Sequence, residues 1–147
     1  MQYLFYSISI IFLSMAIGVS VNNFFQKKKF YNKLTNLRLI KSSRLNKVIG
    51  LNIFKWIMAN TSLNRFNPKL KLKNTSSNTE LERLRREMTS SELSHFIAFL
   101  AVAIVGIYLL LFQSPVFGII LLTLNIFMNL YPSLLQQQNK SRIDKLI

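Results

Sequence analysis

Three long blocks without a charged residue constrain this chain more than any other feature of its sequence. The blocks cover residues 2–21, 96–112 and 116–135. A helix of about twenty residues is about 30 Å long, which matches the hydrocarbon core of a bilayer. Strands of that length in lipid need a closed barrel, and no block shows the alternation of barrel strands. The sequence therefore predicts an all-α membrane protein in which residues 1–147 form a single integral membrane domain with three transmembrane helices.

The second and third blocks are separated only by Gln113, Ser114 and Pro115. Two antiparallel helices are commonly joined by a loop of this length. The sequence therefore predicts that the second and third spans form a helical hairpin.

The first block has two interpretations, a cleaved signal peptide or a retained span. A signal peptide carries basic residues before its apolar run. Here no Lys or Arg precedes the run, and Lys27, Lys28 and Lys29 follow it. This order favours a retained span.

The charges are distributed unevenly and predict the orientation. The chain has 19 Lys and Arg against 5 Asp and Glu, a net charge of +14. Residues 22–79 contain basic residues but no acid, and the C-terminal tail adds Lys140, Arg142 and Lys145. The positive-inside rule places the basic segment, residues 22–95, and the C-terminus in the cytoplasm. The N-terminus is then outside the cell membrane.

The basic segment is itself patterned. Phe30, Leu34 and Leu37 recur at helical spacing, and residues 45–57, with Trp56, repeat the pattern between basic residues. Such a pattern is typical of helices that lie in the membrane interface and attract anionic lipid. The charge alone also allows nucleic-acid binding. The helical spacing and the membrane spans on both sides make that alternative the weaker one, so we expect no nucleic-acid partner.

The residue types present exclude several kinds of site. The chain has no Cys and one His. Disulfides, thiolate sites and metal centres with several His ligands are therefore not expected. The sequence also lacks the glycine-rich phosphate loops and the G-x-S-x-G motif. We expect neither a metal nor a bound cofactor.

One polar cluster precedes the second span and consists of Glu87, Ser91, Glu92 and His95. Glu92 and His95 are three residues apart and share a helix face. A His at the membrane boundary can act as a general base, with a carboxylate orienting its ring. Two alternatives stay open. Thr89 and Glu92 match a capping box at a helix start, and Ser91 can be a nucleophile activated by His95.

A second polar cluster lies on the third span. At 100° per residue, its members fall on one side of a helix. This stripe is either the lining of a polar cavity or a set of hydrogen bonds between spans. Its members are Asn125, Asn129, Pro132, Gln136 and Asn139.

Together the two clusters resemble the motifs of a known family, the glycosyl-4,4′-diaponeurosporenoate acyltransferases. The matching residues are Glu87-x4-Glu92-x2-His95-Phe96 and, after the hairpin, Asn129-x2-Pro132-x3-Gln136-x2-Asn139-x2-Arg142. The chain departs from the family pattern at Gln137, Gln138 and Lys140, where we expect Arg, Tyr and Arg. The resemblance implies a small integral membrane enzyme that transfers a fatty acyl group to a sugar hydroxyl of a membrane glycolipid.

The sequence and the resemblance together predict a membrane O-acyltransferase. We expect His95 to be the general base and Glu92 its orienting partner. The donor is expected to be an acyl thioester of CoA or of acyl carrier protein, attracted by the basic segment. The expected substrate-binding residues are Glu87, Asn129, Gln136, Asn139 and Arg142. The alternative is a non-enzymatic scaffold that binds anionic lipid or a partner membrane protein, and a homo-oligomer fits either function.

Overall fold

The computed structural model describes residues 1–36, 50–60 and 77–147. Within these ranges every regular element is a helix. Three of the helices are long and apolar enough to cross a membrane. The predicted all-α membrane fold with three spans is thus confirmed. The expected helical pattern of residues 37–49 lies outside the described residues.

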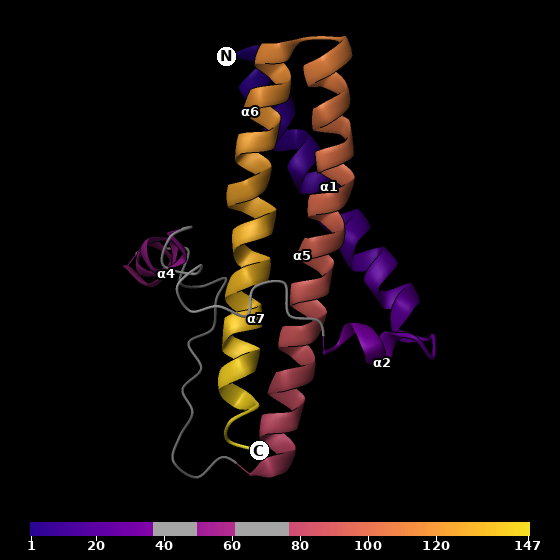
Figure 1. Ribbon diagram of the computed structural model, residues 1–147, viewed down its shortest axis with the longest axis vertical. Coiled ribbons are helices and arrows are strands. Elements are labelled where there is room, and N and C mark those ends of the chain that lie inside the picture. Colours follow the sequence, from indigo (N-terminus) through magenta and orange to yellow (C-terminus); the bar gives the residue numbers. More distant parts are fainter. Residues whose placement is uncertain (37–49, 61–76) are drawn as a thin grey trace.

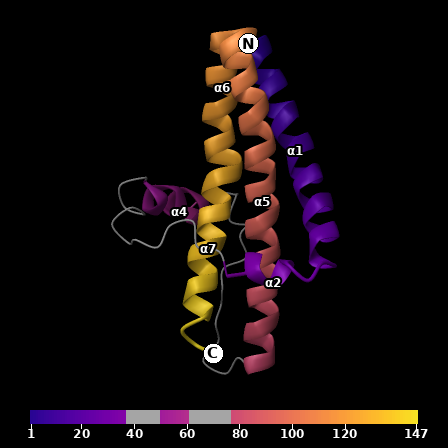
Figure 2. The same cartoon turned by 45° about the vertical axis from the view of Figure 1, so that its right-hand side comes forward.

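The three spans form one elongated bundle. They are α1 (Gln2–Gln26), α5 (Asn78–Phe112) and a third span of three consecutive pieces. The pieces are α6 (Pro115–Asn125), the π-helix η2 (Ile126–Leu130) and α7 (Tyr131–Ile143). Figure 1 and Figure 2 show α5 beside the third span along most of its length, with α1 crossing the upper part of the bundle.

The helical hairpin between the second and third spans is confirmed. α5 ends at Phe112, and Ser114 caps α6 by accepting a hydrogen bond from the backbone N–H of Phe117. Pro115 occupies the start of α6, where its missing N–H costs nothing. Near this turn Gly118 lets the two helices approach closely, because an added Cβ would overlap the backbone of Leu110.

The apolar core lies where the three spans meet. Ile11 of α1, Val102 of α5 and Leu121 of α6 are almost completely buried against one another. A second cluster, Leu81 and Met88 with Ile143, joins the first turns of α5 to the end of α7. The bundle is therefore packed along its whole length, including the part beyond the apolar blocks.

The second span begins much earlier than its apolar block. α5 is one continuous helix of 35 residues, and the Ser77 side chain caps it by accepting from the N–H of Glu80. The alternative of a capping box at Thr89 is wrong, because Thr89 is inside the helix and donates to the carbonyl of Arg85. Residues 78–95 thus extend α5 by about 27 Å beyond the apolar block.

The third span is not a regular α-helix. The π-helix η2 precedes Pro132, which has no N–H to donate back along the helix. A π-turn holds one more residue than an α-turn. Side chains after η2 are therefore rotated by about 100°, the angle of one residue, from the positions that they would have in an uninterrupted α-helix. The single stripe expected from Asn125 to Asn139 assumed an uninterrupted α-helix and does not have this register.

Among the described residues, two short helices lie outside the bundle. α2 (Tyr31–Leu34) follows the turn after α1, and α4 (Leu51–Asn60) lies crosswise beside the third span (Figure 1). α4 contacts α7. Gly50, with a φ of 72°, stands before α4 in a conformation that favours glycine.

Candidate functional site

A groove of about 470 Å³ opens between α1 and α5. Just beside it the two helices are in close contact, because a Cβ added to Gly18 would overlap the carbonyl oxygen of Ser94. α1 contributes apolar side chains to the groove and α5 contributes mainly polar ones. The lining residues are Met15, Val19, Glu87, Ser90, Ser91, Ser94 and His95.

His95 is the ionisable group at the membrane end of this groove. Its side chain is partly buried, and among the described residues its Nδ1 has no hydrogen-bond partner. Its polar neighbour is the side chain of Asn129 in η2. The Oδ1 of Asn129 is also buried and unpaired within the described part of the chain. Two neighbouring side chains thus each carry an unsatisfied polar atom where burial makes it costly.

The amide of Asn129 is held in one orientation. Its Nδ2 donates to Oδ1 of Asn125 over 2.8 Å and is 3.4 Å from Oγ of Ser14. Asn125 in turn donates to the carbonyl of Phe99 over 2.9 Å. These contacts join the third span to α1 and α5, as amide side chains do between membrane helices. They use the donors of Asn129 and leave its Oδ1 available to His95.

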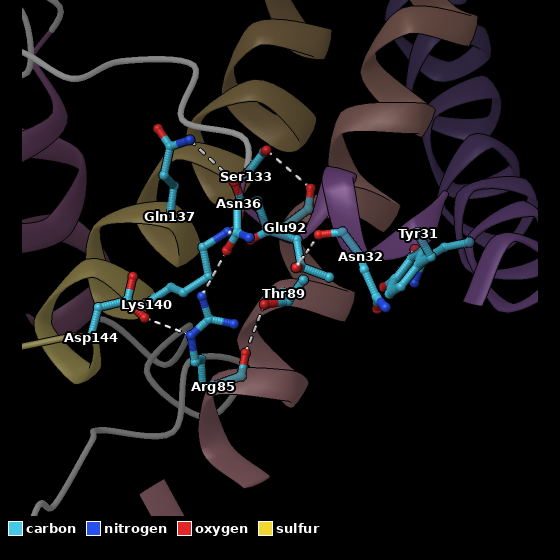
Figure 3. Close-up of polar contacts among 12 residues, drawn as sticks. Tyr31, Asn32, Asn36, Arg85, Thr89, Glu92, Ser133, Gln137, Lys140 and Asp144 are labelled. Atoms are coloured by element: carbon cyan, nitrogen blue, oxygen red, sulfur yellow. Dashed lines mark hydrogen bonds and ion pairs between the residues drawn. The ribbon is translucent and has the colours of Figure 1, made fainter. Parts of the chain in front are cut away.

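Glu92 lies on another side of α5 and takes part in a buried ion pair (Figure 3). Its Oε2 contacts Nζ of Lys140, and its Oε1 accepts a 3.2 Å hydrogen bond from Gln137. Both Glu92 and Lys140 are only 1% exposed. The partners of this carboxylate are thus on α7. The expected orientation of His95 by Glu92 stays a prediction.

Lys140 also binds Thr35, the residue that follows α2. Its Nζ donates to the backbone carbonyl of Thr35 over 2.9 Å. Nearby, Arg85 forms an ion pair with Asp144 and donates to the side chain of Asn36 over 3.2 Å. Charged groups on α5 and α7 therefore hold residues 35 and 36 against the bundle.

A second polar network joins α1, α2 and α5 at the edge of the groove. Asn22 donates to the Ser90 hydroxyl over 3.0 Å, and Gln26 donates to the same oxygen over 3.0 Å. Tyr31 donates to Oδ1 of Asn22 over 3.2 Å. The position of Ser90, which lines the groove, is thus fixed by residues of α1.

The remaining predicted site residues are spread over α5 and α7. Glu87 lines the groove and pairs with Arg83 over 3.2 Å, both largely exposed. On α7, Gln136 is partly buried, Asn139 is buried and Arg142 is exposed. The structure thus brings Glu87 and His95 to one groove.

Sequence reasoning missed several polar residues of the site. Gln137 and Lys140 were noted only as departures from a family pattern, yet they hold Glu92. The rotation introduced by η2 explains this, because it turns Gln137 rather than Gln136 toward the core. Glu92 is the signal that could have indicated Gln137 and Lys140, because a buried acid requires a cation or several hydrogen-bond donors. Asn22 and Tyr31 gave no comparable signal.

Among the described residues, no group of three or more His, Cys, Asp or Glu side chains could hold a metal ion. The chemistry available at the groove is that of one imidazole, three serine hydroxyls and one carboxylate. Such groups can move a proton and hydrogen-bond a hydroxylated ligand.

The comparison with protein families identifies the chain. The family model described as glycosyl-4,4′-diaponeurosporenoate acyltransferase matches residues 22–147. The chain therefore belongs to this family, and the resemblance seen in its motifs is confirmed. A search of the curated proteins and a search of the solved structures gave no match.

Proposed function

We propose that this member of the family transfers a fatty acyl group from a thioester donor to a hydroxyl of a membrane glycolipid. The family name points to an acyltransferase that acts on a glycosyl carotenoid, and a related glycolipid acceptor has the same chemistry. The observation that carries the proposal is His95, which lines a groove beside membrane helices with Nδ1 buried and unpaired among the described residues.

In the proposed reaction His95 acts as the general base. Nε2 takes the proton of the acceptor hydroxyl while the hydroxyl oxygen attacks the thioester carbonyl. The tetrahedral intermediate then collapses, the C–S bond breaks, and the imidazolium returns its proton to the leaving thiolate. The products are an ester and a free thiol, so no further reactant is needed.

Asn129 is the residue best placed to orient His95. If Nδ1 carries the proton, it can donate to Oδ1 of Asn129 after a small rotation, which leaves Nε2 as the base. The donations of Asn129 to Asn125 and Ser14 keep Oδ1 on the His95 side. This assignment gives Asn129 the orienting role that the sequence suggested for Glu92, while Glu92 would hold α7 in place.

The groove is polar at one end and apolar at the other, as a glycolipid is. Glu87 and Ser90 lie toward the water-exposed end of α5, and Met15 lies deeper in the apolar block of α1. A sugar headgroup would bind to the hydroxyls and the carboxylate, and its apolar tail would run past Met15 and Val19. Bound in this way, the acceptor would present a hydroxyl to His95.

The anionic donor would approach from the basic side of the membrane. Arg142 and Lys145 are exposed at the end of α7, and Lys27–Lys29 follow α1. Cations at these positions attract phosphate groups of CoA or of acyl carrier protein. Gln136 and Asn139 of α7 do not line the groove, so their expected role in substrate binding stays a prediction. By the positive-inside rule this side is cytoplasmic.

A scaffold without catalytic activity is the second candidate, and the amide contacts of Asn125 favour it. Asn125 and Asn129 already serve as hydrogen bonds between spans. A protein that only assembles other membrane components would need those contacts and would not need His95.

The test is lipid mass spectrometry on cells with the intact gene, no gene, His95→Gln or Ser91→Ala. His95→Gln keeps the size and polarity of the side chain but removes the base. We expect a lipid heavier by one acyl chain with the intact gene, a smaller amount of it with Ser91→Ala, which removes one hydroxyl of the groove, and its loss with His95→Gln. The membrane content of each variant is measured in parallel.

Each other outcome has a distinct meaning. Identical lipid profiles in all four strains, with the protein present, contradict acyl transfer and favour the scaffold. Loss of product with Ser91→Ala and not with His95→Gln makes Ser91 the nucleophile and refutes the base assignment. The mass of the lipid core identifies the acceptor.

A further inference from the structure

The short helix α4 presents large apolar side chains away from the bundle. Ile53 and Trp56 are each 67% exposed. The opposite face is docked on the third span, because Leu51 is buried and the Phe54 ring stacks on Tyr131 with centroids 5.1 Å apart. Tyr131 stacks in turn on Phe127 at 5.5 Å. α4 is thus fixed by one face and uncovered on the other.

We propose that the uncovered face of α4 inserts into the membrane interface, in the leaflet from which α5 and α7 emerge. This proposal concerns how the chain sits in lipid and does not depend on the acyltransferase activity.

The position of α4 along the third span supports insertion into the membrane interface. α4 docks at Tyr131, which precedes the polar run that starts at Gln136 by five residues, about 7.5 Å along the helix. Interfacial helices bury their apolar face about 5–10 Å below the headgroup boundary. α4 lies crosswise to the long bundle in both views (Figure 1, Figure 2). A helix perpendicular to the spans at this depth runs parallel to the membrane plane.

The polarity around α4 fits a lipid surface better than water or a protein core. At 100° per residue, Asn52 and Lys55 lie about 60° apart on one edge, while Ile53 and Trp56 lie on the exposed side. α4 contains no acidic residue. Tryptophan is enriched at the membrane–water interface, and a lysine at this level is attracted to anionic headgroups.

The chain itself contains the probe for this proposal, because Trp56 is its only tryptophan. The purified full-length protein is reconstituted in vesicles of phosphatidylcholine and phosphatidylglycerol. Separate samples contain phosphatidylcholine brominated near the ester linkage, at mid-chain or near the chain end. We expect blue-shifted emission, the greatest loss of intensity with the shallow bromine, and weak quenching by aqueous iodide.

Two further variants separate the position of α4 from the local environment of one side chain. Ile53→Trp in a Trp56→Phe background moves the probe along the same face and should give the same depth profile. Lys55→Trp in that background moves the probe about 100° around the helix from Trp56 to the polar edge, where iodide quenching should increase and bromine quenching should fall. Strong iodide quenching of Trp56 without bromine quenching overturns the proposal, as does strongest quenching by bromine near the chain end.

Discussion

The buried ion pair between Glu92 and Lys140 allows a quantitative test of how the membrane-proximal bundle is held together. Each side chain is 2% exposed, and each has a second polar partner, Gln137 for Glu92 and the carbonyl of Thr35 for Lys140. The perturbations are Lys140→Met, Glu92→Leu and the double substitution. Met and Leu keep apolar volume and remove the charge.

The expected change in the free energy of unfolding depends on which charged group stays buried without its partner. Lys140→Met leaves a buried carboxylate with only the Gln137 donor, and Glu92→Leu leaves a buried ammonium. Each single substitution should lower the free energy of unfolding by about 3–5 kcal/mol. The double substitution leaves no buried charge and loses two hydrogen bonds, the donation of Gln137 to Glu92 and that of Lys140 to Thr35. It should therefore cost at most about 1–3 kcal/mol. The interaction energy of the cycle should then exceed about 3 kcal/mol.

The assay is reversible unfolding in mixed micelles with increasing sodium dodecyl sulfate, followed by circular dichroism of the helices. Arg86→Met is the matched control, because Arg86 and Glu82 form an i,i+4 pair with side chains 71% and 55% exposed. Such a pair contributes about 0.3–0.5 kcal/mol. The reasoning is refuted if Lys140→Met costs no more than this control, or if the double substitution costs as much as both single ones together.

Two further predictions concern the contacts between spans. Gly18→Ala should destabilise the bundle by about 1–3 kcal/mol in the same unfolding assay, because its Cβ would overlap the carbonyl of Ser94, which is backbone and cannot turn away. Gly106→Ala is its control and should cost less, since its Cβ would meet only the side chain of Leu122; equal costs would contradict the argument. Asn125→Leu should cost about 0.6–2 kcal/mol by removing its hydrogen bond to α5 and the one that it accepts from Asn129, and an unchanged unfolding curve would show that these bonds are not net stabilisers.

The spans and the hairpin could be predicted because their causes are local. An uncharged run of bilayer length must satisfy its own backbone hydrogen bonds, and only a helix does so within one segment. Ser114 and Pro115 likewise terminate and restart helices by their own chemistry. The continuity of α5 from Asn78 into the apolar block was harder to predict, because the packing of the polar residues before that block is tertiary.

The candidate site could be predicted only in part, and η2 explains much of the difference. Helical spacing placed Asn125 and Asn129 on one side, and both are buried and joined by a hydrogen bond, although Asn129 lies within the π-helix. After the π-helix the same spacing selects Gln136, although Gln137 is the residue that contacts Glu92. The pairing of Glu92 with Lys140 spans 48 residues, and no local pattern encodes a contact of that range.

The two polar networks around α5 act on the same short helix, α2. On one side Tyr31 donates to Asn22, which holds Ser90 at the groove. On the other side Lys140 holds the carbonyl of Thr35. Tyr31 and Thr35 are one helical turn apart, so α2 and the residue after it connect α7 to α1 through hydrogen bonds. Lys140 does not line the groove, but through α2 it is connected to Asn22 and Ser90 at the edge of the groove.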